Sequence, residues 1–162
     1  MSSTFLLWKT AHILSAAILF GGGIVIASIC WFGYRNALKA GQIDSLRTVL
    51  RFTVLADACL TAPAVFFQAA SGHVLANSLG WPMTGPWALA AWSLFVFVGL
   101  CWVPVVAIQI YLDREARRLP NIEALPSRFH RWFRVWFALG VPAFLAMLLI
   151  FYLMVAKPLP PI

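Results

Sequence analysis

Apolar residues run in four long stretches, and short polar segments separate them. The stretches cover residues 5–33, 51–77, 87–112 and 134–156. Each reaches the roughly 20 residues that an α-helix needs to cross a hydrocarbon core of about 30 Å. The pattern predicts an all-α fold, an integral membrane four-helix bundle. Because the connections are short, residues 1–162 are expected to form a single transmembrane domain.

The composition supports this prediction. Apolar residues make up 62% of the 162 residues and charged residues only 10%, whereas a soluble domain needs more charge to stay solvated. The three cysteines are isolated, without the spacing of a metal site or a disulfide framework, and are interpreted as small core residues. The lipid bilayer is therefore the first partner that the sequence predicts.

Basic residues gather in two of the polar segments. Ten of the twelve Lys and Arg residues lie in 34–51 and 113–134, and only Lys9 and Lys157 lie towards the other side. Such segments stay in the cytoplasm, so both termini are predicted to face outward, an N-out/C-out topology. The net charge of +7 is then explained by these cytoplasmic segments, and no nucleic acid partner is expected.

One face of the first helix is predicted to point into the bundle. His12 lies on it, about 10 Å from the outer end at 1.5 Å per residue, and an ionisable residue inside a span requires a partner. Neutral imidazole is an axial ligand for haem iron, so His12 is the candidate metal ligand. Ala16, Gly22 and Gly23 leave space for a flat macrocycle, or equally for a neighbouring helix.

The second helix has a polar face of its own. If this helix is regular, the face comprises Thr53, Asp57, Thr61, Ala64, Gln68, Ser71 and Gly72. Gln68 on this face reaches a depth similar to that of His12, so the two are expected to bond to each other or to share a ligand. Asp57 lies near the inner end, where Arg131 or Arg134 is expected to form a structural ion pair with it, in preference to a proton relay. Pro63 interrupts the helix and predicts a kink.

A sixth haem ligand has two candidates. His73 projects away from the polar face of its helix, unless the kink rotates it. Met147 on the fourth helix is nearer the required depth, although Met is also a common core residue. The predicted cofactor-binding set is His12, Gln68, Gly22, Gly23, Ala16 and Met147.

The chain also resembles known families. From Leu7-Trp8-Lys9-Thr10-Ala11-His12 to the ending Val155-Ala156-Lys157-Pro158, it resembles the domain-of-unknown-function family 2269 of predicted bacterial integral membrane proteins. It is distantly similar to the HemJ-type protoporphyrinogen oxidases, through Trp8 to His12, Thr61 to Ala64 and Ser127-Arg128-Phe129. That resemblance implies haem b at His12 and a bacterial cytoplasmic (inner) membrane location with periplasmic termini. Those enzymes carry a functional Lys in the third helix, and residues 87–112 contain none.

Two functions follow as hypotheses. The first is a b-type haem or porphyrin-binding redox protein, whose partner would be a quinone, a porphyrin or a membrane redox protein. If it is an enzyme, the resemblance implies a membrane oxidoreductase. The alternative is a non-catalytic accessory or assembly subunit, whose polar faces only specify helix packing. A homo-oligomer is compatible with both.

Overall fold

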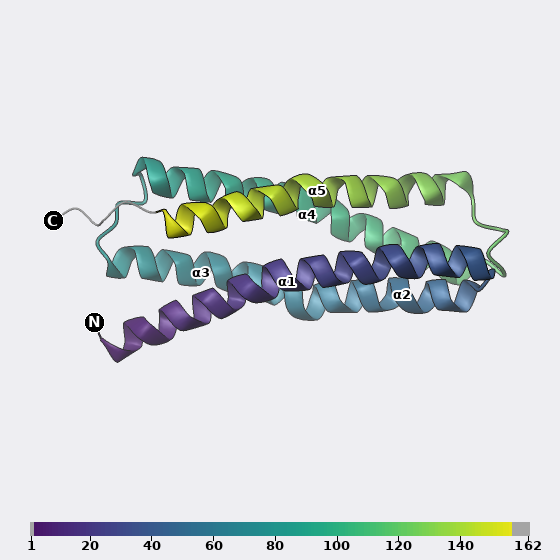
Figure 1. Ribbon diagram of the computed structural model, residues 1–162, viewed down its shortest axis with the longest axis horizontal. Helices are drawn as coiled ribbons and strands as arrows, with labels where there is room; N and C mark the ends of the chain where they lie inside the picture. The colour runs from purple at the N-terminus through teal and green to yellow at the C-terminus, as the bar shows by residue number, and fades with distance from the viewer. Residues whose placement is uncertain (1, 157–162) are drawn as a thin grey trace.

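The computed structural model describes residues 2–156, which are helical apart from short connections and contain no strand. The helices pack side by side in one elongated bundle (Figure 1). Because α2, η1 and α3 follow one another without a break, the described chain crosses the bundle four times. The elements are α1 (Ser3–Ala40), α2 (Ile43–Ala56), η1 (Asp57–Thr61), α3 (Ala62–Ser78), α4 (Pro86–Arg118) and α5 (Ser127–Val155).

Local sequence explains where α1 begins and ends. The Ser2 side chain accepts a hydrogen bond from the backbone N–H of Phe5 at 3.3 Å and caps the first turn. At the other end Gly41 adopts φ 67°, the left-handed conformation in which glycine ends a helix without a side-chain penalty. Only Gly41 and Gln42 separate α1 from α2. The α1–α2 connection is thus much shorter than the polar segment 34–51 suggested.

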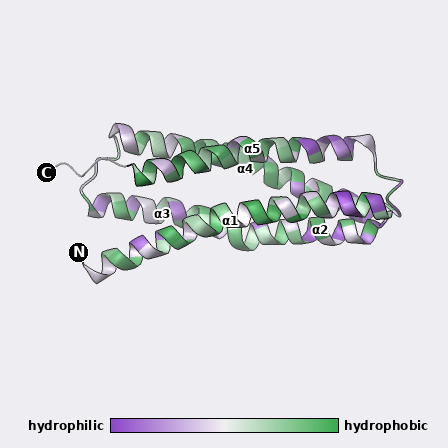
Figure 2. Cartoon of the chain, in the orientation of Figure 1, coloured by the Kyte–Doolittle hydropathy of each residue, from purple (hydrophilic) through white to green (hydrophobic). Residues whose placement is uncertain are grey.

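The helices are longer than the predicted spans because they continue beyond the apolar stretches. The 38 residues of α1 extend about 57 Å at 1.5 Å per residue, well beyond a hydrocarbon core of about 30 Å. Hydrophilic residues gather at the end of the bundle that holds the α1–α2 turn (Figure 2). Arg and Lys are good helix formers, so the helical pattern carries on into the aqueous phase.

Large apolar side chains cover the outside of the bundle. Phe66 is 72% exposed, Leu7 70% and Leu100 69%. Apolar surface on this scale is unstable in water and suits contact with acyl chains. Each of the four crossings within residues 2–156 is long and apolar enough to span a membrane.

The two ends of the bundle pack differently. A cluster of buried large residues joins α1, α2, α4 and α5 at the end that holds the α1–α2 turn, which we call the arginine end. The opposite end is called the outer end, after the predicted topology. There α1 packs on α3 and α4 on α5, and the buried residues are mostly small or polar. Small residues let helix backbones approach closely in lipid. The buried cluster at the arginine end includes Leu46, Leu50, Leu112, Phe129 and Phe133.

The second crossing contains a π-helical turn, η1, just before Pro63. Its closing hydrogen bond runs from the Ala62 N–H to the Asp57 carbonyl, five residues back. Proline has no N–H, and its ring clashes with the carbonyl four residues earlier, so a wider turn relieves the conflict. The predicted interruption at Pro63 takes the form of this π-turn.

Candidate functional site

His12 is held between two side chains of α3, in the outer half of the bundle. Its Nδ1 lies 2.7 Å from Ser71 Oγ, and its Nε2 lies 2.9 Å from Gln68 Nε2. Ser71 is fully buried, whereas His12 and Gln68 are partly buried. The structure therefore brings His12 and Gln68 together.

The hydrogen-bond pattern assigns the proton of the His12 ring. Ser71 Oγ lies 2.6 Å from the Phe67 carbonyl oxygen, which can only accept, so the serine hydroxyl donates there. Ser71 must then accept from His12 Nδ1–H, and the neutral ring is left with a lone pair on Nε2. Gln68 donates its amide N–H to that lone pair. The Gln68 Oε1 atom is buried, and nothing within residues 2–156 donates to it.

Gly72 lies against the His12 ring, and Ser15 adds a further bond between α1 and α3. A Cβ built at Gly72 would be 3.3 Å from His12 Cε1. Ser15, one turn below on α1, donates to the Ala64 carbonyl at 3.1 Å. A larger residue at 72 would crowd the imidazole. Sequence periodicity had placed Ser71 and Gly72 on the polar face but could not single them out.

A pocket of about 370 Å³ opens one helical turn outward from His12. Trp8, which stacks on Phe67 with ring centroids 6.1 Å apart, forms part of its wall. Its volume falls in the range of small-molecule sites, which is roughly 300–1,000 Å³. The lining residues are Ser2, Thr4, Phe5, Trp8, Val74, Ser78 and Leu79.

Three consecutive glycines of α1, Gly21 to Gly23, do not pack closely against another helix. A Cβ added at Gly21, Gly22 or Gly23 would meet nothing within 4 Å. Ala16, one turn inward from His12, is partly buried. Open space beside the backbone is therefore found at Gly22 and Gly23.

Met147 lies deeper in the bundle than His12. Phe20 stacks on Phe144 at 5.0 Å and meets Phe151 edge-on at 5.3 Å, so Met147, between these two in sequence, lies near the level of Phe20. Phe20 is eight residues inward of His12, about 12 Å along α1. The structure does not bring Met147 to the depth of His12.

Asp57 is buried in the π-turn, but no ion pair joins it to Arg131 or Arg134 in the described part of the chain. Both arginines are exposed. The reason is topological: η1 packs against α1, α2 and α3, whereas α5 packs mainly on α4. The acidic residues that pair within residues 2–156 are Asp44, Asp113 and Glu115, with Arg47, Arg117 and Arg128.

The other two histidines lie apart from His12. His73 is exposed and contacts Asn77 on its own helix, with 3.0 Å between His73 Nε2 and Asn77 Nδ2. His130 lies at the arginine end, with Nδ1 2.5 Å from the Tyr34 hydroxyl. The Tyr34 contact was not predicted, because it joins residues 96 apart. Within residues 2–156, no three His, Cys, Asp or Glu residues gather as a metal-binding group.

The fold and these contacts define a small integral membrane protein whose polar residues join the first and second spans. The chain matches the family model DUF2269, described as a predicted integral membrane protein, over residues 6–158, and it belongs to this family. Comparisons with curated proteins and with solved structures find no match.

Proposed function

We propose that this protein is a membrane redox protein that binds a b-type haem or a porphyrin through His12. The supporting observation is the orientation of the His12 ring, whose Nδ1–H is donated to Ser71 while Nε2 carries the lone pair. Histidines that ligate metals donate their second ring nitrogen in this way, which fixes the tautomer and the ring plane.

Gln68 is the competitor for the ligand atom. Its amide occupies His12 Nε2 at 2.9 Å, while its Oε1 is buried without a donor in the described chain. An unpaired buried oxygen costs about 1–3 kcal/mol. A rotation that moves the Gln68 side chain outward would free Nε2 and also let Oε1 reach a donor.

The surroundings offer room for such a group. The pocket beside Trp8 begins one helical turn from His12, and open space beside the α1 backbone at Gly22 and Gly23 lies about 15 Å inward. Haem iron would supply reversible one-electron chemistry at this depth, and a quinone or a membrane redox protein would exchange the electrons. His12 would hold the group and Ser71 would hold His12.

The test is the reduced-minus-oxidised visible spectrum of the full-length protein, purified in mild detergent from haem-replete cells. We expect a Soret band that His12→Ala removes. His73→Ala is the matched control, because His73 is also a histidine in the outer half but is exposed, and it should keep the band. Gln68→Ala should keep or raise the haem content, since it removes the competitor for Nε2.

Two results would contradict the proposal. One is purified protein without haem from haem-replete cells. The other is a Soret band that persists in His12→Ala, which would exclude His12 as the ligand. Oxidation of protoporphyrinogen would be assayed separately, because haem binding does not imply that reaction.

The second candidate is a non-catalytic accessory or assembly subunit. It is favoured by a specific observation: His12, Gln68, Ser71 and Ser15 all form hydrogen bonds that join α1 to α3. Such bonds specify helix pairing in lipid. A haem-free protein that His12→Ala destabilises, and that copurifies with another membrane subunit, would support this candidate.

A further inference from the structure

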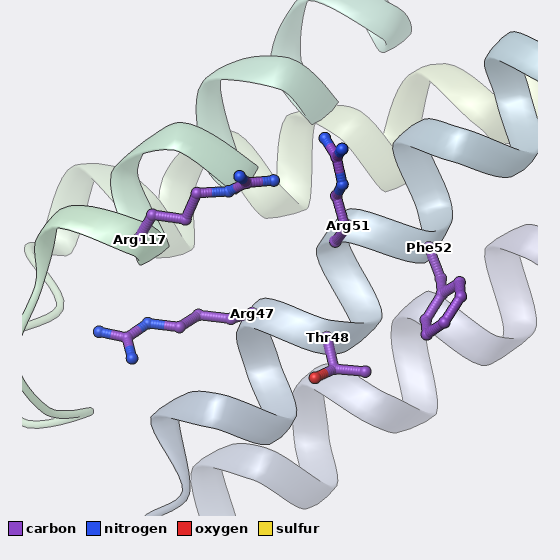
Figure 3. Close-up of a pocket in the computed structure, with 5 residues that line it drawn as sticks. All are labelled: Arg47, Thr48, Arg51, Phe52 and Arg117. Atoms are coloured by element: carbon purple, nitrogen blue, oxygen red, sulfur yellow. The ribbon is translucent and has the colours of Figure 1, made fainter.

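At the arginine end, a pocket of about 380 Å³ lies between α2 and α4. Figure 3 shows its residues, and three of the five are arginines. The pocket is far from His12, which lies in the outer half of the bundle. The lining residues are Arg47, Thr48, Arg51, Phe52 and Arg117.

Arg47 forms a fixed wall of this pocket. Its Nε donates to the Ala116 carbonyl at 3.1 Å and its Nη2 to the Leu119 carbonyl at 2.5 Å, at the end of α4. Its Nη1 pairs with Asp44 at 2.6 Å. Carbonyls at a helix C-terminus have no partner within the helix, so Arg47 satisfies two of them and ties α2 to α4.

Arg117 and Arg51 contribute the other two guanidinium groups. Arg117 grips the Asp113 carboxylate with Nε and Nη2, at 2.7–3.1 Å, yet its side chain remains 47% exposed. Arg51 is exposed, and its side chain forms no hydrogen bond or ion pair with the rest of residues 2–156. In Figure 3 the guanidinium groups of Arg117 and Arg51 extend from opposite helices towards the same space.

The charges around the pocket do not balance. Asp44 and Asp113 neutralise Arg47 and Arg117, and the positive charge of Arg51 is left over. Two guanidinium groups that converge repel each other, and an anion between them would relieve this repulsion. Arg51 can donate two parallel hydrogen bonds to phosphate oxygens, and Arg117 still has its Nη1 donors, because its Nε and Nη2 bind Asp113.

The apolar side of the pocket identifies the source of the phosphate. Phe52 lines the pocket, is 63% exposed, and lies where α2 enters the apolar surface of the bundle. A free phosphate ion would gain nothing from contact with this apolar ring, whereas the acyl chain of a lipid would pack along it. Thr48 also lines the pocket, and its exposed side chain adds a hydroxyl donor for the phosphate.

We propose that this pocket binds the phosphate headgroup of an anionic phospholipid, from the leaflet on the arginine side. Arg51 and Arg117 hold the phosphate and Phe52 contacts the acyl chain. Basic pockets between transmembrane helices bind anionic headgroups in this way. No residue of this pocket belongs to the His12 site, so the lipid proposal and the haem proposal can be tested separately.

The experiment measures lipid binding to the full-length protein in neutral detergent by native mass spectrometry. Phosphatidylglycerol is titrated against phosphatidylcholine, and phosphatidylglycerol is expected to be retained preferentially. Arg51→Gln should weaken this retention about fivefold. Arg35→Gln is the matched control, because Arg35 is an exposed arginine on α1 that does not line the pocket, and it should leave retention unchanged.

Further arms separate the possible outcomes. Inorganic phosphate should neither replace the lipid nor protect the protein against heat, and if it does both, the site is a free-anion site and the lipid proposal is wrong. If Arg51→Gln and Arg35→Gln weaken phosphatidylglycerol retention equally, the retention depends on general surface charge, and the proposed binding pocket is wrong. Phe52→Ala should weaken lipid retention without changing the response to phosphate. An unchanged circular dichroism spectrum would confirm that each variant folds.

Discussion

At the scale of single residues, the His12 contacts combine a structural and a chemical property. Periodicity along the first two spans predicted that His12 and Gln68 lie at similar depth, and the 2.9 Å contact agrees with this. The proton position on His12 could not be predicted. It depends on the Ser71 hydroxyl, which donates to the Phe67 carbonyl and so must accept from the ring.

Ser71→Ala should destabilise the protein by about 1 kcal/mol, because His12 Nδ1–H loses its acceptor in an interior where interhelical hydrogen bonds are worth up to roughly 1.7 kcal/mol. Ser78→Ala is the control. Ser78 also donates to the carbonyl four residues back, Val74, but it is exposed and has no bond to another helix. It should change stability by less than about 0.5 kcal/mol. Equilibrium unfolding in mixed micelles measures both, and equal effects would contradict the role given to the His12 bond.

At the scale of elements, close packing of α1 depends on a glycine that the sequence did not single out. The run Gly21–Gly23 favoured a packing face, yet a Cβ at these positions meets nothing within 4 Å. At Gly33 a Cβ would be 2.6 Å from Val49 Cγ2 and 2.9 Å from Val49 Cγ1. The α1–α2 contact therefore has no room for a side chain at Gly33.

Gly33→Ala should destabilise the protein by about 1–3 kcal/mol, because the β-branched Val49 has little rotamer freedom to move away. Val49→Ala in the same chain should restore part of this loss, and a double-mutant cycle measures the coupling. Gly22→Ala adds a methyl group in open space and should leave stability unchanged or raise it by less than about 1 kcal/mol. A larger loss at Gly22 than at Gly33 would mean that the packing is assigned to the wrong glycine.

In the second crossing, the π-turn rotates the residues of α3 about the helix axis relative to those of α2. The π-turn at Asp57–Thr61 inserts one residue ahead of Pro63, so the faces of α2 and α3 are set separately. The α2 segment packs on both α1 and α4, whereas α3 packs mainly on α1. Sequence spacing predicts one continuous polar face from Thr53 to Gly72 only if the helix is regular, and the π-turn breaks this regularity between Asp57 and Gln68.

At the scale of the whole molecule, the bundle is polar at one end and apolar along its length. The described ends of α1 and α5 lie together with the α3–α4 connection at the outer end, opposite the α1–α2 turn (Figure 1). An even number of crossings within residues 2–156 requires this arrangement. Which end faces the cytoplasm follows from the excess of Arg and Lys at the arginine end, and it remains a prediction.

The predicted orientation can be measured by labelling single cysteines in intact cells. In a chain with Cys30, Cys59 and Cys101 replaced by Ala, Thr84→Cys in the α3–α4 connection should react with a membrane-impermeant maleimide. Ser45→Cys at the arginine end should react only after the membrane is disrupted. Both positions are exposed, so access to the reagent depends on the side of the membrane. The opposite pattern would show that the basic end faces outward.

The sequence by itself determined the four spans, the concentration of charge at one end and the shared depth of His12 and Gln68. These properties depend on hydropathy and on helical rise, which are local and additive along the chain. The tertiary structure alone decided which residues are partners: Ser71 for the His12 ring, Val49 against Gly33, and Arg51 beside Arg117. It also separated Asp57 from Arg131 and Arg134. Partner choice depends on how each helix is rotated about its axis and which helix lies next to it, and a single π-turn is enough to change both.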